Sequence, residues 1–69
     1  MQCYEYQLML ARVFDLITLT QPGFKYDFIV LSDILAELDV DTLQDLDKVD
    51  PRLIRMQALA YLQDYQLAA

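Results

Sequence analysis

The apolar residues of the chain recur at helical spacing, in segments separated by short polar links. At about 100° per residue, the apolar side chains of residues 2–19 fall on one continuous face: Cys3, Tyr6, Met9, Leu10, Val13, Phe14, Leu16 and Ile17. This face is wider than the ~100° stripe of an ordinary surface helix. The pattern predicts a helix over about 2–19 that the rest of the chain, or a second copy, must cover.

The segment after this helix is ambiguous. Pro22 and Gly23 predict a turn with positive φ at the glycine. Residues 24–28 then alternate like a strand, and the pattern alone leaves open whether 24–31 begins as strand or helix. Because no second strand is available, we favour an aromatic link followed by a helix over 28–38, capped by Asp27. Its expected buried face carries Phe28, Leu31, Ile34, Leu35 and Leu38.

Two more helices are predicted in the second half of the chain. A short one over 42–47 follows Asp41 as its cap, with Leu43 and Leu46 facing inward. The last, over 51–66, begins at the pair Asp50-Pro51. Its main apolar face holds Ile54, Ala58, Tyr61 and Tyr65, with Leu62 at one edge, and a second stripe on the far side holds Leu53, Met56 and Ala60. The predicted fold is all-α, a compact bundle of three to four helices in a single domain over 1–69.

Composition narrows how such a bundle can be stabilised. A domain of 69 residues buries little surface, and small domains are usually reinforced by disulfides, a metal or association. The single cysteine, Cys3, cannot form an internal disulfide, and the absence of histidine excludes the usual Cys/His zinc site. The acidic run 39–50 lacks the glycine of an EF-hand loop. We therefore expect no metal and no cofactor, and association as a homodimer or with another protein.

Charge is distributed unevenly along the chain. The net charge is −6, and residues 27–50 carry eight acidic side chains against Lys48 alone. Nucleic acids and anionic membranes are bound through basic residues, so neither is an expected partner. The apolar runs are shorter than the ~20 residues of a membrane span, and no signal peptide is apparent. We expect a cytoplasmic protein.

Residues 36–43 resemble parts of two known families. Ala36 to Val40 followed by Thr42 resembles the second and third helices of helix-turn-helix repressors, but the turn glycine and one residue are missing. The recognition helix would also carry two aspartates and only one lysine. Residues 41–43, Asp-Thr-Leu, resemble the Asp-Ser-Leu motif of acyl carrier proteins, whose serine carries phosphopantetheine; here a threonine stands instead, and Asp50-Pro51 interrupts the following helix. We therefore favour neither DNA binding nor a carrier function.

The candidate binding residues are apolar side chains set among charges on the outer faces of the first and last helices. Scattered surface leucines are common, but such clusters also mark interfaces. The expected protein-binding residues are Leu8, Leu19, Arg52, Arg55, Leu59 and Leu62. Without histidine and with one cysteine, the usual nucleophile–base pairs cannot form, so we expect no enzyme. The predicted function is a protein–protein interaction module, an adaptor, regulator or inhibitor that binds a partner protein and is itself a homodimer.

The acidic region supports an alternative function. A DNA mimic displays carboxylates at phosphate-like spacing and thereby occupies a nucleic-acid-binding protein. The carboxylates of residues 27–50 would serve this role, with the acidic surface formed by Asp39, Asp41, Asp45 and Asp47.

Overall fold

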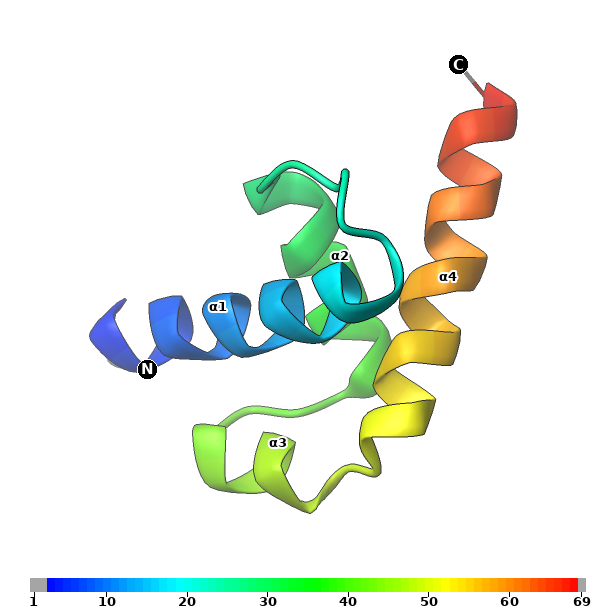
Figure 1. Ribbon diagram of the computed structural model, residues 1–69. Coiled ribbons are helices and arrows are strands. Elements are labelled where there is room, and N and C mark those ends of the chain that lie inside the picture. Colours follow the sequence, from blue (N-terminus) through cyan, green and yellow to red (C-terminus); the bar gives the residue numbers. More distant parts are fainter. Residues whose placement is uncertain (1–2, 69) are drawn as a thin grey trace.

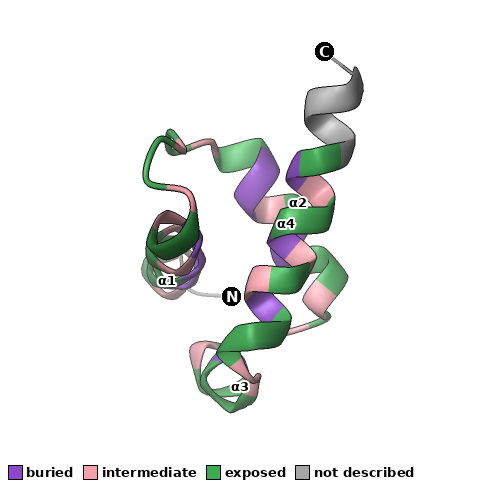
Figure 2. Cartoon of the chain, turned by 45° about the vertical axis from the view of Figure 1, so that its right-hand side comes forward, coloured by how far each residue is buried: buried purple, intermediate pink, exposed green. Residues whose placement is uncertain are grey.

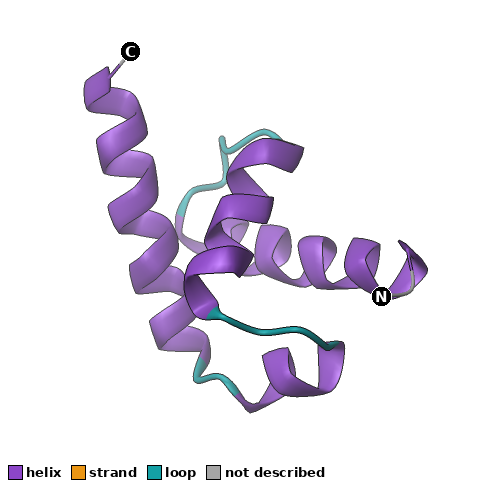
Figure 3. Ribbon diagram, turned by 180° about the vertical axis from the view of Figure 1, so that it is seen from behind, coloured by secondary structure: helices purple, strands orange, loops and turns teal. Residues whose placement is uncertain are grey.

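The protein is built from four helices, shown by a computed structural model that describes the backbone of residues 3–68 and the side chains of residues 4–63. The helices are α1 (Cys3–Thr20), α2 (Phe28–Leu38), α3 (Leu43–Lys48) and α4 (Pro51–Ala68) (Figure 1). No strand occurs in residues 3–68, where only loops and turns join the helices (Figure 3). The predicted all-α bundle is confirmed, with helix ends within two residues of those expected. The predictions for the side chains of Cys3 and Tyr65 lie outside the described residues.

Helix α1 is the central element of the bundle. It packs against each of the other three helices, and α2 also packs against α4. In Figure 1, α1 and α4 run crosswise, and α3 lies below α1. The wide apolar face predicted for α1 is thus covered within one chain, because three different helices share it.

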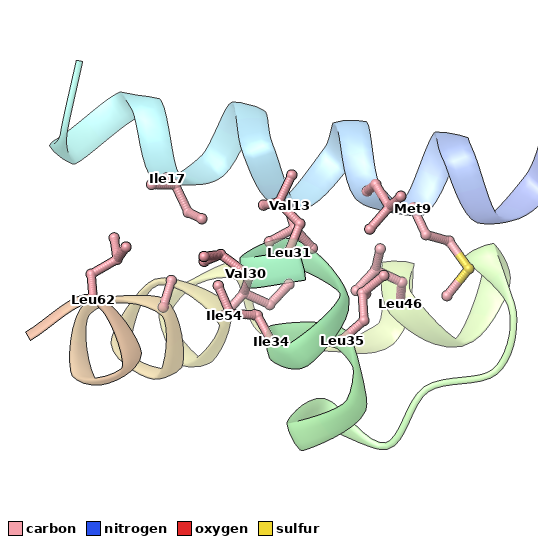
Figure 4. Packing of buried hydrophobic residues seen from close by; sticks show 12 residues of the cluster. Met9, Val13, Ile17, Val30, Leu31, Ile34, Leu35, Leu46, Ile54 and Leu62 are labelled. Carbon is pink, nitrogen blue, oxygen red and sulfur yellow. The ribbon is translucent and has the colours of Figure 1, made fainter. Parts of the chain in front are cut away.

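The core forms where α1 faces the other helices. Met9, Leu10, Val13 and Ile17 are at most 2% exposed, which confirms the predicted face of α1. In Figure 4, Met9, Val13 and Ile17 point toward buried side chains of the other three helices: Val30, Leu31, Ile34, Leu35, Leu46, Ile54 and Leu62. Leu10 and Ala58 belong to the same cluster. Burying one side chain of the Leu or Ile type stabilises a fold by about 1.5–3 kcal/mol relative to exposure, so this cluster is the main source of stability.

One tyrosine hydroxyl from α1 and one from α4 bind side chains of α2. The Tyr6 hydroxyl donates a hydrogen bond to Ser32 Oγ at 2.8 Å. The Tyr61 hydroxyl donates to Asp33 Oδ2 at 2.6 Å. The two bonds tie α2 to α1 and to α4 at the rim of the apolar core.

The buried face of α2 differs from the prediction at its first turn. Phe28 was expected inside, but it is 56% exposed, and Val30 is buried instead. The Asp27 carboxylate accepts hydrogen bonds from the N–H groups of Ile29 and Val30 at 3.0 and 3.2 Å, which confirms it as the cap. With the helix phase set there, the inner stripe is Val30, Leu31, Ile34 and Leu35. Phe28 falls at the edge of this stripe. The Phe28 ring packs edge-on against the Tyr6 ring, with 6.2 Å between the ring centroids.

The prediction of a positive φ at Gly23 is wrong. Residues 21–24 do form a turn, in which the Phe24 N–H donates to the Gln21 carbonyl at 3.0 Å, but Gly23 has no positive φ. A type I turn with proline at its second position takes negative φ at both central residues. Among the described residues the positive φ belongs to Asp39, at 56°, which ends α2 in the left-handed conformation.

The caps of the last two helices are partly as predicted. Asp50 accepts a hydrogen bond from the Arg52 N–H at 2.9 Å, which confirms the start of α4. The cap of α3, however, is Thr42 and not Asp41: Thr42 Oγ1 accepts from the Asp45 N–H at 3.1 Å. The helix begins one residue later than expected, so the capping position moves with it.

Candidate protein-binding surface

One helix of the bundle presents apolar side chains to solvent along the side that faces away from the core. Leu53, Met56 and Leu59 are 56%, 66% and 45% exposed, and Ala60 is also exposed. We call these four residues the outer α4 face. They lie outside because Ile54, Ala58 and Leu62 form the stripe that packs on α1 and α2. Figure 2 shows exposed positions along α4 opposite its buried ones.

Open grooves flank α4 on both sides. The groove toward the end of α1 has a volume of about 530 Å³, and its lining includes Thr20, Gln21, Arg55 and Leu59. The groove toward the end of α2 has a volume of about 790 Å³, and its lining includes Glu37, Leu38, Val49 and Leu53. Met56 lines both. The outer α4 face is therefore a ridge between two grooves, and a partner can contact it from either side.

The two edges of this ridge carry different charges. Arg52 and Arg55 line the groove on the α1 side. Glu37, Asp50 and Lys48 line the groove on the α2 side. One edge is therefore basic, and the other carries more acidic than basic groups.

Asp50 and Arg52 form an exposed ion pair at the start of α4. Arg52 Nη2 donates to Asp50 Oδ2 at 2.9 Å. Hydrogen bonds from the Arg52 side chain, then from its backbone N–H, hold the pKa of the Asp50 carboxyl below its usual value, and the charge of Arg55 adds to this effect. The same bond raises the pKa of Arg52. Both groups therefore stay charged at neutral pH.

The structure brings together half of the predicted binding residues. Arg52, Arg55 and Leu59 line one groove, whereas Leu8 and Leu19 are exposed on α1 and are absent from its lining. Leu19 directly precedes Thr20 of that groove. Leu8 lies 11 residues earlier, about 16 Å along the helix.

Leu62 is a correction to the predicted set. It is 6% exposed and belongs to the core cluster. The sequence places Leu62 at the edge of the inner stripe of α4, where a single neighbouring helix would leave it partly open. Because both α1 and α2 pack on this side of α4, they cover the edge as well.

Leu53 and Met56 are the surface residues that the predicted set missed. The sequence did contain their signal, because they form the second apolar stripe of the last helix. Periodicity alone could not tell whether another helix of the bundle would cover this second stripe as well.

The four predicted acidic residues are all exposed, but they do not form one row. Asp39 ends α2, and Asp41 lies in the link before α3. Asp45 and Asp47 are two residues apart on α3, so they point about 200° apart around the helix. Asp47 also forms an ion pair with Arg12 of α1. The carboxylates therefore point in several directions, and one of them is already paired.

A second exposed apolar region lies at the start of α2. Tyr26, Phe28 and Ile29 are 53%, 56% and 69% exposed. The Tyr26 ring packs edge-on against Phe14, with 5.4 Å between the ring centroids. Phe24, in the same link, packs against Phe14 and the core, as expected of the aromatic link. Ring contacts therefore already cover part of this region.

Within the described residues, no group of three histidine, cysteine, aspartate or glutamate side chains could hold a metal ion. No described helix is both long and apolar enough to cross a membrane.

The chain matches no known protein family, and searches against curated proteins and against solved structures likewise found no match.

Proposed function

We propose that the protein is a small helical protein-interaction module, an adaptor, regulator or inhibitor, that acts by binding a protein partner through the outer α4 face. The observation that carries this proposal is the exposure of Leu53, Met56 and Leu59 on one ridge between two open grooves. Contiguous apolar side chains rimmed by polar ones are typical of interaction sites in soluble proteins.

Covering this face removes apolar surface from water and so contributes to binding. Full burial of a Leu or Met side chain is worth about 1.5–3 kcal/mol. Since the three large side chains are about half exposed, covering them contributes roughly 2–4 kcal/mol. Arginine is enriched among the residues that dominate interfaces, and Arg52 and Arg55 stand at the edge of this face.

The acidic region supports a second candidate, a DNA mimic. Asp39, Asp41 and Asp45 are exposed, and residues 27–50 are strongly acidic. The pairing of Asp47 with Arg12 and the spread of the α3 carboxylates count against a continuous phosphate-like row.

The two candidates are separated by a pull-down with matched variants. Met56→Glu places a charge on the outer α4 face, and Tyr4→Glu places the same charge at an exposed site near the start of α1. Asp39→Asn, Asp41→Asn and Asp45→Asn are combined in a third variant. Circular dichroism confirms that each variant is folded.

We expect wild type and the Tyr4 variant to retain the same bound protein, and the Met56 variant to lose it. Binding through the apolar face changes little with salt, whereas exposed charges are screened within ~10 Å at 0.1 M salt. Binding that survives Met56→Glu but is lost in the carboxylate variant, with steep salt dependence, would contradict the proposal and favour the DNA mimic.

A further inference from the structure

The exposed side of α4 has the spacing of a coiled-coil seam. Leu53, Met56, Ala60 and Gln63 follow one another at intervals of three, four and three residues, and all are exposed. In the sequence, the same spacing continues to Leu67. Alternating steps of three and four are the repeat by which two helices pack side by side. A helix, rather than a strand or a loop, is therefore the occupant that fits the outer α4 face.

The side chain of Gln63 indicates what a partner helix must carry at this level of the seam. Its side chain continues the seam beyond Ala60, so a second helix on this face would cover a polar amide. Against an apolar side chain the amide would lose its hydrogen bonds with water, which costs about 1–3 kcal/mol. Against another glutamine both amides are satisfied, since each has a donor and an acceptor. A two-fold axis along the seam places Gln63 opposite its own copy.

The edge charges select the orientation of the pair. When two identical helices lie parallel about a two-fold axis, each edge of one faces the opposite edge of the other. When they lie antiparallel, like edges face each other. Arg52 and Asp50 are paired with each other, which leaves Arg55 on one edge and Glu37, with Lys48, on the other. The parallel arrangement therefore brings Arg55 toward the edge that carries Glu37 on both sides of the seam, whereas the antiparallel one brings Arg55 toward its own copy.

We propose that the outer α4 face is covered by a second copy of this chain, with the two α4 helices parallel and in register. This inference rests on the proposed function and names the partner of that surface. Ala60 lets the two helix backbones approach closely, and Leu53 and Met56 supply the apolar contact on either side of it.

The test is directed disulfide formation in a chain whose native cysteine is removed by Cys3→Ser. Leu53→Cys and Ala60→Cys are then made separately, with Gln44→Cys at an exposed site on α3 as the matched control. In a parallel pair each seam residue faces itself, so both seam variants should oxidise to covalent dimers, and the control should not. Sedimentation equilibrium of the wild type should give about twice the chain mass of 8.1 kDa.

A second pair of variants tests the role of the amide. Gln63→Glu should weaken dimerisation at neutral pH at least tenfold, because two carboxylates then face each other. Gln44→Glu adds the same charge elsewhere and should have little effect. Equal dimerisation of the two variants would contradict the in-register pairing.

Other results would contradict the parallel pairing of two copies and leave the proposed function intact. A wild type that remains monomeric at high concentration rules out the second copy, yet loss of a bound partner in Met56→Glu would still support the interaction module. If only one of the two seam variants cross-links, the helices are antiparallel and the proposed arrangement is wrong, since in that geometry a residue meets itself only at the two-fold axis.

Discussion

The carboxylate of Glu5 accepts a hydrogen bond from the backbone N–H of Leu43 at 2.8 Å, across 38 positions of sequence. The first N–H groups of a helix have no partner within the helix, and Thr42 satisfies only that of Asp45 at the start of α3. Glu5 supplies a second acceptor from α1. Together with buried Leu46 and the Arg12–Asp47 ion pair, this bond holds α3 in place on α1.

Glu5→Ala should lower the free energy of unfolding by about 1–2 kcal/mol, because the Leu43 N–H loses a charged acceptor in a partly buried place. Urea denaturation measures the loss, and hydrogen exchange of the α3 amides should become faster. Glu5→Gln keeps an acceptor oxygen and should lose less. Gln7→Ala, at an exposed site on α1, is the control. If α3 exchanges at the wild-type rate in Glu5→Ala, the bond does not anchor this helix.

Leu62→Ala and Leu59→Ala compare the two sides of α4 with the same chemical change. Leu62 is 6% exposed, so its truncation leaves a cavity and should cost about 2–4 kcal/mol. Leu59 is 45% exposed and should cost less than about 1 kcal/mol. Denaturation midpoints in urea give both values, measured at a protein concentration too low for self-association. Equal losses at the two sites would mean that the phase of α4 is different from the one described.

Gly23→Ala should raise the free energy of unfolding by about 0.4–1 kcal/mol. Gly23 has no positive φ, and a methyl group there would meet no atom within 4 Å. Alanine then stabilises the fold by reducing the freedom of the unfolded chain. Thermal unfolding followed by circular dichroism is the measurement. A fall in the melting temperature would indicate that the turn needs the left-handed conformation after all.

Asp39→Gly should also stabilise the protein, by about 1 kcal/mol. Asp39 has φ of 56°, where glycine is favoured over residues with a side chain, and its charge lies at the carboxyl end of α2, where a negative charge is unfavourable. Asp39→Asn removes the charge while keeping a side chain, so it separates the two causes. Asp41→Gly, in the neighbouring link, should give no such gain in chemical denaturation.

The Asp50–Arg52 pair makes part of the stability depend on pH. The pKa of Asp50 in the folded protein lies below its ordinary value of 3.8. A carboxyl whose pKa is lowered by folding stabilises the folded state above its unfolded pKa, and this contribution is lost as the pH falls through the folded pKa. The difference in unfolding free energy between wild type and Asp50→Asn should therefore shrink from about pH 5 to about pH 2. A constant difference would show that Asp50 acts as a cap in both protonation states.

Local sequence patterns predict the four helices and most of the core, because helical periodicity and caps act over a few residues. The spacing of Met9, Val13 and Ile17 is sufficient to identify the inner face of α1, whatever packs on it. Asp27 and Asp50 cap helices that begin within two residues of them, so the local sequence contains all the partners involved.

Which apolar surface stays exposed depends on how the helices pack on one another. The last helix has two apolar stripes. The sequence predicts the one with Ile54 and Ala58 as the main face, but it does not say whether the one with Leu53 and Met56 is covered as well. Packing of α1 and α2 on the first stripe buries Leu62 at its edge and leaves the second stripe in solvent. The hydrogen bond from the Leu43 N–H to Glu5 could not be predicted either. The two residues are 38 positions apart, and nothing in the sequence distinguishes Glu5 from a glutamate exposed to solvent. Contacts between distant segments depend on how the helices pack, and that arrangement exists only in the folded chain.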